Sequence, residues 1–109
     1  MLLDTSGLLC LQHGSEAEHE AAMAYFDASF WRVTHSYVLA EYVALAQARG
    51  FPRREALDFV VDLQDSSEVE VIYVDEELHR AALGLLQRRL DKSWSLADAV
   101  SLVLCSAWV

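Results

Sequence analysis

Short apolar runs with the composition of strands alternate with longer segments that have the periodicity of helices along the whole chain. The strand-like runs are residues 1–3, 30–34 and 69–74. The helical patterns cover residues 6–12, 15–29, 36–49, 53–64, 75–90 and 95–109. Strands that alternate with helices indicate a parallel sheet with helical crossovers, so we expect an α/β fold with a short parallel sheet flanked by helices.

The length and composition fit one domain. A chain of 109 residues lies within the usual size of a compact domain, and its 54% apolar residues can supply a core. The longest apolar run, residues 99–109 with two interrupting serines, is much shorter than the roughly 20 residues that span a bilayer. Asp4 interrupts the opening, where a secretory signal would be apolar. We therefore expect a soluble, cytoplasmic protein that does not associate with membranes.

The net charge of −9 at pH 7 argues against simple electrostatic binding of nucleic acid. The excess of acids is uneven, because residues 1–77 carry 15 acidic and 4 basic residues whereas residues 78–109 carry 2 acidic and 4 basic ones. A divalent cation held by carboxylates also reverses the sign of the local charge. The charge therefore counts against a nuclease without excluding one.

Three acidic residues stand alone among apolar neighbours, whereas most of the other carboxylates fall on solvated helix faces. Asp4 ends the first strand-like run, Glu41 lies in the middle of a helical segment, and Asp98 lies in the first turn of the last helix. A carboxylate on an apolar face is costly unless it is paired or bound to a cation, and none of the three has a basic partner nearby in the sequence. One shared cation would account for all three.

Each of these acids also has a purely structural interpretation. Asp4 is placed to cap the first helix, and Asp98 follows Ser95 at the spacing of a capping box. Glu41 lies too far inside its helix to cap it, and its alternatives are a side chain that reaches the solvent or one that pairs with the distant Arg32. Because sites in parallel sheets gather at the carboxyl ends of strands, we nevertheless expect the three acids to face one cleft.

Three motifs in order resemble those of PIN-domain ribonucleases. The run Leu3-Asp4-Thr5-Ser6-Gly7-Leu8-Leu9 resembles the opening motif of that family. The run Val33-Thr34-His35-Ser36-Tyr37-Val38-Leu39-Ala40-Glu41 resembles the second motif, which ends in its acidic residue. The run Asp91-Lys92-Ser93-Trp94-Ser95-Leu96-Ala97-Asp98-Ala99-Val100-Ser101 resembles the third. Their order and spacing agree along essentially the whole chain and are most similar to the toxin halves of VapC-type toxin–antitoxin modules.

This resemblance implies a PIN-like three-layer fold and endoribonuclease activity that depends on Mg²⁺ or Mn²⁺. It implies Asp4 and Asp98 as the principal metal ligands. Glu41 would be a further ligand, directly or through water, or would position the attacking water. Such hard cations bind oxygen ligands, and they activate a bound water and stabilise charge on the phosphodiester. The implied partners are an RNA substrate and an antitoxin protein.

Six further residues are predicted to be auxiliary or to contact the substrate. Ser6 and Ser101 flank the acids and can orient a ligand or a phosphate oxygen, and Asp91 matches the third motif from a polar loop. The candidates for contact with RNA phosphates are the basic residues close to that motif: Arg88, Arg89 and Lys92. By contrast, the four histidines lack metal-ligand spacing and are expected to be structural or exposed: His13, His19, His35 and His79.

The chain departs from the family pattern at its end. The family continues past the third motif to a strand that carries a fourth acidic residue, whereas this sequence stops at Val109. We expect residues 1–109 to form a single PIN-like domain that is incomplete at the C-terminus, with the last strand or strands missing. The open sheet edge beside the first strand then favours a homodimer or aggregation, and cleavage is expected to be weak or absent. The last helix is also expected to expose part of its apolar surface: Leu102, Val103, Leu104, Trp108 and Val109.

Two other functions stay open. A catalytically inactive PIN-like interaction module would keep the fold and bind a partner without the chemistry. A phosphoacceptor signalling domain that uses Asp4 fits less well, because no acidic pair follows the first strand and the only lysine is Lys92. Cleavage of RNA that depends on a divalent cation separates the nuclease from both alternatives.

Overall fold

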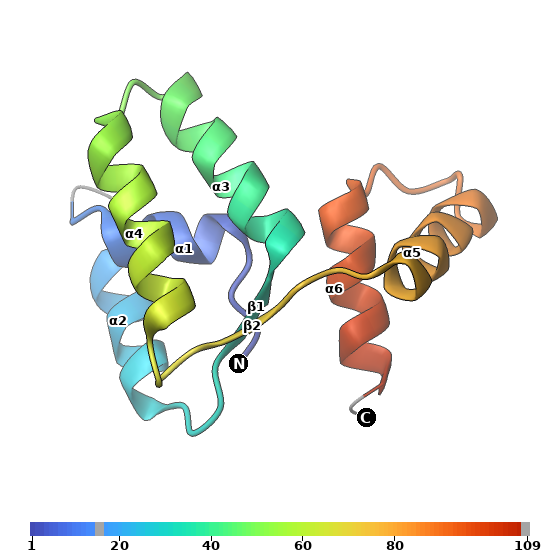
Figure 1. Cartoon of the computed structure of the whole chain (residues 1–109), viewed down its shortest axis with the longest axis horizontal. Coiled ribbons are helices and arrows are strands. Elements are labelled where there is room, and N and C mark those ends of the chain that lie inside the picture. The colour runs from blue at the N-terminus through green and yellow to red at the C-terminus, as the bar shows by residue number, and fades with distance from the viewer. Residues whose placement is uncertain (15–16, 108–109) are drawn as a thin grey trace.

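A computed structural model of the chain describes residues 1–14 and 17–107 (Figure 1). In chain order, its elements are α1 (Thr5–Gln12), α2 (His19–Ala28), β1 (Val33–His35), α3 (Ser36–Ala48), α4 (Arg53–Asp65), β2 (Glu70–Ile72), α5 (Glu76–Arg88) and α6 (Leu96–Ala107). The predicted alternation of strands and helices is confirmed, and with it the α/β fold class.

The sheet is parallel and very short. β1 and β2 pair over three residues, with Thr34 opposite Val71 at the centre. On the other side of β1, the N-terminal run joins the sheet through a single parallel bridge from Leu2 to Val33, and Leu3 N donates a hydrogen bond to Val33 O at 2.7 Å. The three predicted strand segments therefore lie side by side, although the first of them is reduced to a bridge.

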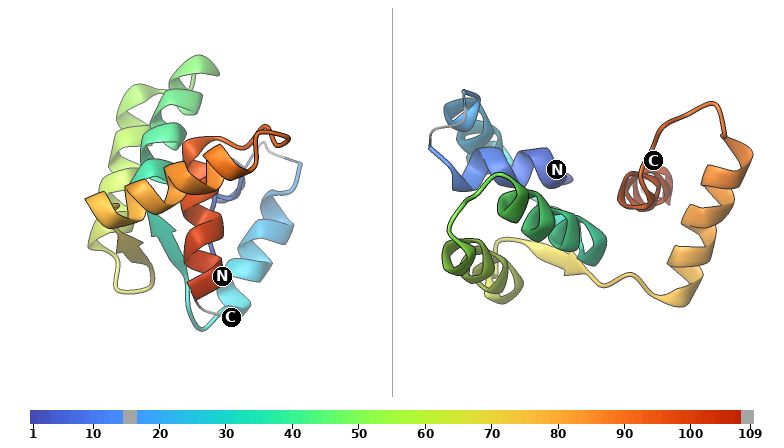
Figure 2. Two further views of the ribbon diagram at one scale, coloured as in Figure 1. Left: turned by 90° about the vertical axis from the view of Figure 1, so that its right-hand side faces the viewer. Right: turned by 90° about the horizontal axis from the view of Figure 1, so that it is seen from above.

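Buried side chains form two clusters, one around α1, α3 and α4 and the other between α5 and α6. Figures 1 and 2 show helices α1 to α4 gathered on one side of the sheet and the α5–α6 pair on the other. The larger cluster contains Leu3, Leu8, Leu9, Val38, Leu39, Tyr42, Ala46, Ala56, Leu63 and Val69. The smaller cluster contains Ala82, Ala99 and Val100. Helix α3 contacts both α4 and α6 and so connects the two parts.

Hydrogen bonds with side chains cap the starts of helices α1, α5 and α6. Asp4 Oδ1 accepts a hydrogen bond from Gly7 N at 2.7 Å, and Asp75 caps α5 in the same way. Ser95 and Asp98 cap α6 reciprocally, because Asp98 Oδ2 accepts from Ser95 N and Ser95 Oγ accepts from Asp98 N, both at 3.0 Å. The capping interpretation of Asp4 and Asp98 is therefore confirmed, and it fixes both carboxylates at helix starts.

Two predicted boundaries in the N-terminal half are wrong. Helix α2 begins at His19 rather than directly after Ser15, and Ser15 itself lies outside the described residues. Strand β1 begins at Val33 rather than at Phe30, and the side chains of Phe30 and Trp31 are exposed. The aromatic composition of residues 30–31 favours a strand only where neighbours cover it, and both side chains are exposed here.

The exposed apolar surface predicted for the last helix is present in part. Leu102 is exposed, and Val103 and Leu104 are half-buried. Trp108 and Val109, which the sequence also places on this surface, lie outside the described residues. Among the residues that the structure describes, no helix is long and apolar enough to cross a membrane.

Candidate functional site

A cavity of about 330 Å³ lies where the starts of α1 and α6 meet α3. Its walls are Asp4, Thr5 and Ser6 at the start of α1, Val38, Glu41 and Leu45 on α3, and Ser95, Ala97, Asp98 and Ser101 at α6. The three solitary acids of the sequence thus line one cavity, together with two of the residues predicted to assist them, Ser6 and Ser101. This placement agrees with the expected cleft, while the catalytic and metal-binding roles of these residues stay predictions.

Each of the three carboxylates is held by a hydrogen bond from its own neighbourhood. Asp4 and Asp98 use one oxygen each to cap their helices. Glu41 Oε2 accepts a hydrogen bond from the hydroxyl of Thr5 at 3.1 Å, which ties α3 to the start of α1. Within residues 1–14 and 17–107, the second oxygen of each carboxylate has no hydrogen-bond or ion-pair partner. One oxygen therefore orients each group and the other is available to a ligand.

The environment of the acids differs from the sequence prediction in two respects. Glu41 does not pair with Arg32, because the Arg32 guanidinium donates to the Phe26 carbonyl and lies 4.1 Å from the centre of the Phe26 ring. Asp4 and Asp98 are exposed and only Glu41 is half-buried. These acids stand out in the sequence because burial of a charge is costly. That cost does not apply to Asp4 and Asp98, and it applies only in part to Glu41.

The donor atoms of the cavity suit a hard divalent cation. Carboxylate and hydroxyl oxygens dominate its polar lining, and no lysine or arginine is among the described residues that line it. Mg²⁺ and Mn²⁺ prefer such oxygen ligands and retain several waters, so few protein ligands are needed. In the positions described, however, no group of three or more His, Cys, Asp and Glu side chains is arranged to hold a metal ion. The cavity therefore offers oxygen donors that suit a divalent cation, but its acids are not already arranged around a metal position.

The other four residues predicted to assist lie outside this cavity. Asp91 and Arg89 form a bidentate pair with both N–O distances at 3.0 Å, and the Arg89 hydrogen bond lowers the pKa of the Asp91 carboxyl. Lys92 lies 5.8 Å from the centre of the Trp94 ring, and Arg88 lines a separate groove between α5 and α6. None of these four residues is among those that line the cavity with the three acids.

Sequence reasoning did not identify two residues that hold the cavity together, Thr5 and His35. Thr5 positions Glu41, and its place directly after Asp4 in the opening motif is the signal that could have identified it. The His35 ring is completely buried and hydrogen-bonds Ser101 Oγ through Nε2 at 2.8 Å. Burial lowers the pKa of His35 to about 4, although a hydrogen bond with the backbone of Ala97 offsets part of this effect. The prediction that His35 is structural or exposed thus misses its contact with the cavity wall.

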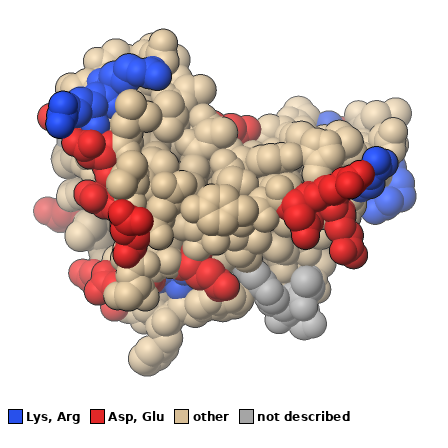
Figure 3. All heavy atoms as spheres, in the orientation of Figure 1, with Lys and Arg blue, Asp and Glu red and all other residues tan. Residues whose placement is uncertain are grey.

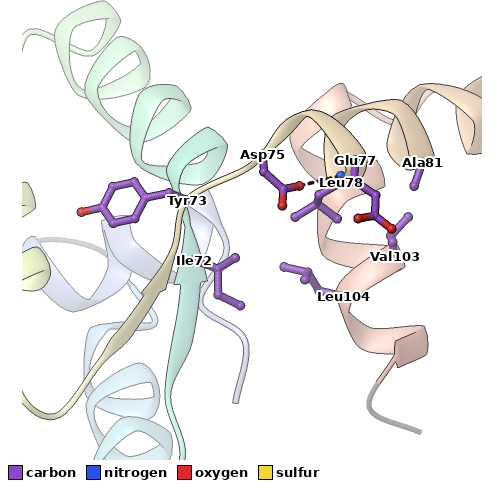
Figure 4. A pocket seen from close by; sticks show the side chains of 8 residues that line it. All are labelled: Ile72, Tyr73, Asp75, Glu77, Leu78, Ala81, Val103 and Leu104. Carbon is purple, nitrogen blue, oxygen red and sulfur yellow. Dashed lines mark hydrogen bonds between the residues drawn. The ribbon is translucent and has the colours of Figure 1, made fainter.

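A second cavity of about 310 Å³ lies between the end of β2 and the α5–α6 pair (Figure 4). Ile72 and Leu104 face one another across it. Of its two carboxylates, Asp75 is occupied with capping α5 through Leu78 N. The lining is otherwise mainly apolar, so this cavity offers less to a cation or a phosphate than the first one does.

Asp4 contributes to folding as well as to the cavity, and substitution separates the two contributions. Asp4→Ala removes the cap on Gly7 N and is expected to lower the free energy of unfolding by about 1 kcal/mol. Asp4→Asn keeps an accepting oxygen at the cap and is expected to lower it by much less. Urea unfolding of the three proteins measures the difference, and equal losses in both variants would contradict the capping role.

The fold has a counterpart among solved structures. It is similar to that of the Sarcin-Ricin loop cleaving toxin VapC20 of Mycobacterium tuberculosis, with a TM-score of 0.85 and 24% sequence identity, over 97% of this chain and 81% of that chain. Comparisons of the sequence with protein-family models and with curated proteins give no match. The structural likeness shows that the chain has the PIN-like fold of a VapC toxin, which confirms the fold implied by the three motifs.

Proposed function

We propose that this chain is an endoribonuclease of the toxin–antitoxin type that depends on Mg²⁺ or Mn²⁺ and acts at the cavity between α1, α3 and α6. The observation that carries the proposal is that Asp4, Glu41 and Asp98 line one cavity in a fold similar to that of an RNA-cleaving toxin. Neither part suffices alone, because a shared fold does not fix a function and exposed carboxylates are common.

Asp4 and Asp98 would hold the cation, and Glu41 would bind it directly or through a water. When bound, the cation supplies an acidified water and offsets negative charge at the phosphodiester. The chain's own groups prepare this arrangement. The Gly7 and Ser95 amides orient Asp4 and Asp98. The Thr5 hydroxyl leaves the other oxygen of Glu41 free to bind the cation or to position the attacking water.

RNA must approach a protein that is acidic overall, so basic side chains outside the cavity matter for binding. Figure 3 shows Lys and Arg gathered at two separate ends of one face, with acidic side chains between them. Near α6, Arg89 is neutralised by Asp91, which leaves Arg88 and Lys92 as the better candidates for phosphate contact. Phosphate contacts of this kind weaken steeply as the salt concentration rises.

Cleavage of an RNA that contains a sarcin–ricin loop, with and without divalent cation, tests the proposal. We expect at least weak cleavage in Mg²⁺ or Mn²⁺ and its loss when EDTA removes the cation. Because an ion that binds only the folded chain stabilises it, the same titration should raise the unfolding temperature. Cleavage that persists in EDTA would contradict the metal dependence, and its absence under every cation would contradict the nuclease.

A catalytically inactive interaction module is the second candidate. It is favoured by one observation: among the described residues, no three acidic or other metal-ligating side chains are arranged to hold a metal ion. In that case the fold would bind a partner without cleaving RNA. An antitoxin partner follows from the toxin proposal and is tested by co-purification. A homodimer and a cytoplasmic location stay predictions from the sequence, and sedimentation and fractionation test them.

A further inference from the structure

A buried histidine stands directly behind the cavity wall. His35 ends β1 and has no exposed surface, and its two ring nitrogens contact a backbone amide and a side-chain hydroxyl. Nδ1 accepts a hydrogen bond from Val38 N at 3.3 Å at the start of α3. Nε2 lies 2.8 Å from the hydroxyl oxygen of Ser101, a residue of the cavity wall that is 66 positions further along the chain.

The partners of the ring determine where its proton is. An amide N–H can only donate, so Nδ1 must be the unprotonated nitrogen that accepts from Val38. The neutral ring then carries its proton on Nε2, 2.8 Å from Ser101 Oγ, and the backbone of Ala97 is a second acceptor beside the ring. Because the Ser101 oxygen is occupied as an acceptor, the hydroxyl hydrogen of Ser101 is left to donate elsewhere. Burial keeps the ring in this neutral form, since it lowers the pKa of His35 to about 4.

We propose that His35 is a positioning residue that fixes the Ser101 hydroxyl as a hydrogen-bond donor to a phosphodiester oxygen of RNA bound in the cavity. This inference rests on the proposed nuclease function and adds a role that the three acids do not supply. His35 itself touches no substrate, because it is completely buried and acts only through Ser101.

An acidic cavity needs a neutral donor if it is to hold a phosphate oxygen, and the Ser101 hydroxyl is such a donor. The charged residues that line the cavity in the described part of the chain are all carboxylates, and they repel an anionic phosphate. The Ser101 hydroxyl hydrogen-bonds none of these carboxylates, and among the described residues its hydrogen-bond partner is the His35 ring. A neutral donor with a fixed orientation is the kind of group that stabilises an anionic oxygen without displacing a cation.

A double-mutant cycle on RNA cleavage tests the inference. Ser101→Ala removes the donor and is expected to lower kcat about 10- to 100-fold, with little change in KM. His35→Asn keeps an acceptor for Val38 N but frees the hydroxyl to rotate, and it is expected to lower kcat about fivefold. The double variant is expected to cleave no more slowly than Ser101→Ala, because His35 has no effect once its target is gone.

The matched control is His79→Asn. The His79 ring also hydrogen-bonds a hydroxyl side chain, that of Tyr37, but it does not line the cavity, so its replacement should leave kcat unchanged. Loss of kcat in this control equal to that of His35→Asn would overturn the proposal. Equal effects of His35→Asn with and without Ser101 would also overturn it, because a purely structural cap acts independently of Ser101.

Nitrogen NMR of the intact chain tests the hydrogen bond without relying on activity. We expect a single neutral His35 ring with the proton on Nε2 and no titration between pH 5.5 and 8. A proton on Nδ1 would overturn the inference while leaving the nuclease proposal intact. A wild-type chain that cleaves no RNA with any cation would instead overturn the proposed function and, with it, the role of Ser101 toward phosphate.

Discussion

Asp98→Asn is expected to cleave RNA at least about 100-fold more slowly than the unmodified chain, because it removes one of the charges proposed to hold the cation. The amide oxygen of asparagine can still accept a hydrogen bond from Ser95 N, so the cap on α6 is retained and the chain should fold. Asp4→Asn is expected to show a loss of the same order for the same reason. Initial rates of RNA cleavage at saturating Mg²⁺ or Mn²⁺ measure both effects.

The matched control for these variants is Asp91→Asn. Asp91 is an exposed carboxylate of the same sequence motif, but it pairs with Arg89 outside the cavity. Its replacement frees Arg89 but removes no group that lines the cavity, so the cleavage rate should change far less than in Asp98→Asn. A loss of cleavage rate in Asp91→Asn as large as that in Asp98→Asn would point to a general effect of charge. It would contradict the assignment of Asp98 as a ligand.

The chain is expected to lose about 2 kcal/mol of stability between pH 7 and pH 5 through His35 alone. Burial lowers the pKa of this ring to about 4 from its ordinary value of 6.5, so the unfolded chain takes up the proton first. The stability that the neutral ring contributes is therefore complete above pH 6.5. It is lost as the pH falls from 6.5 towards 4.

Urea unfolding at several pH values measures this dependence. The comparison is with His35→Asn, which cannot titrate and whose stability should fall less over the same range. The difference between the two proteins isolates His35, because the other histidines are common to both. Parallel curves would show that His35 is not kept neutral by the fold.

Local signals explain why much of the fold could be predicted from the sequence. Pro52 before α4, Asp75 before α5 and Ser95 before α6 mark helix starts through their own backbone or side-chain chemistry, and the structure has helices there. The two acids at helix starts were located for the same reason. These features depend on residues within one turn of each other, which a sequence displays directly.

Contacts between distant segments could not be predicted in this way. The Thr5 hydroxyl, rather than Arg32, holds Glu41, and this choice depends on how α1 packs against α3. The pairing of His35 with Ser101 depends on where α6 lies relative to β1. Arg89 was predicted to contact RNA, but the loop after α5 brings it to Asp91 instead. Packing, and not local propensity, decides each of these partners.

The two separate hydrophobic clusters have a consequence for how the site can be controlled. Asp4 and Glu41 belong to the side of the first cluster, whereas Asp98 is carried by α6, whose apolar face belongs to the second. A hinge movement of the α5–α6 pair would therefore separate Asp98 from Asp4 and Glu41 without changing any of the three carboxylates. Conversely, a cation bound by carboxylates from both parts would hold them together. Amide hydrogen exchange in α6 should therefore slow when the cation is bound.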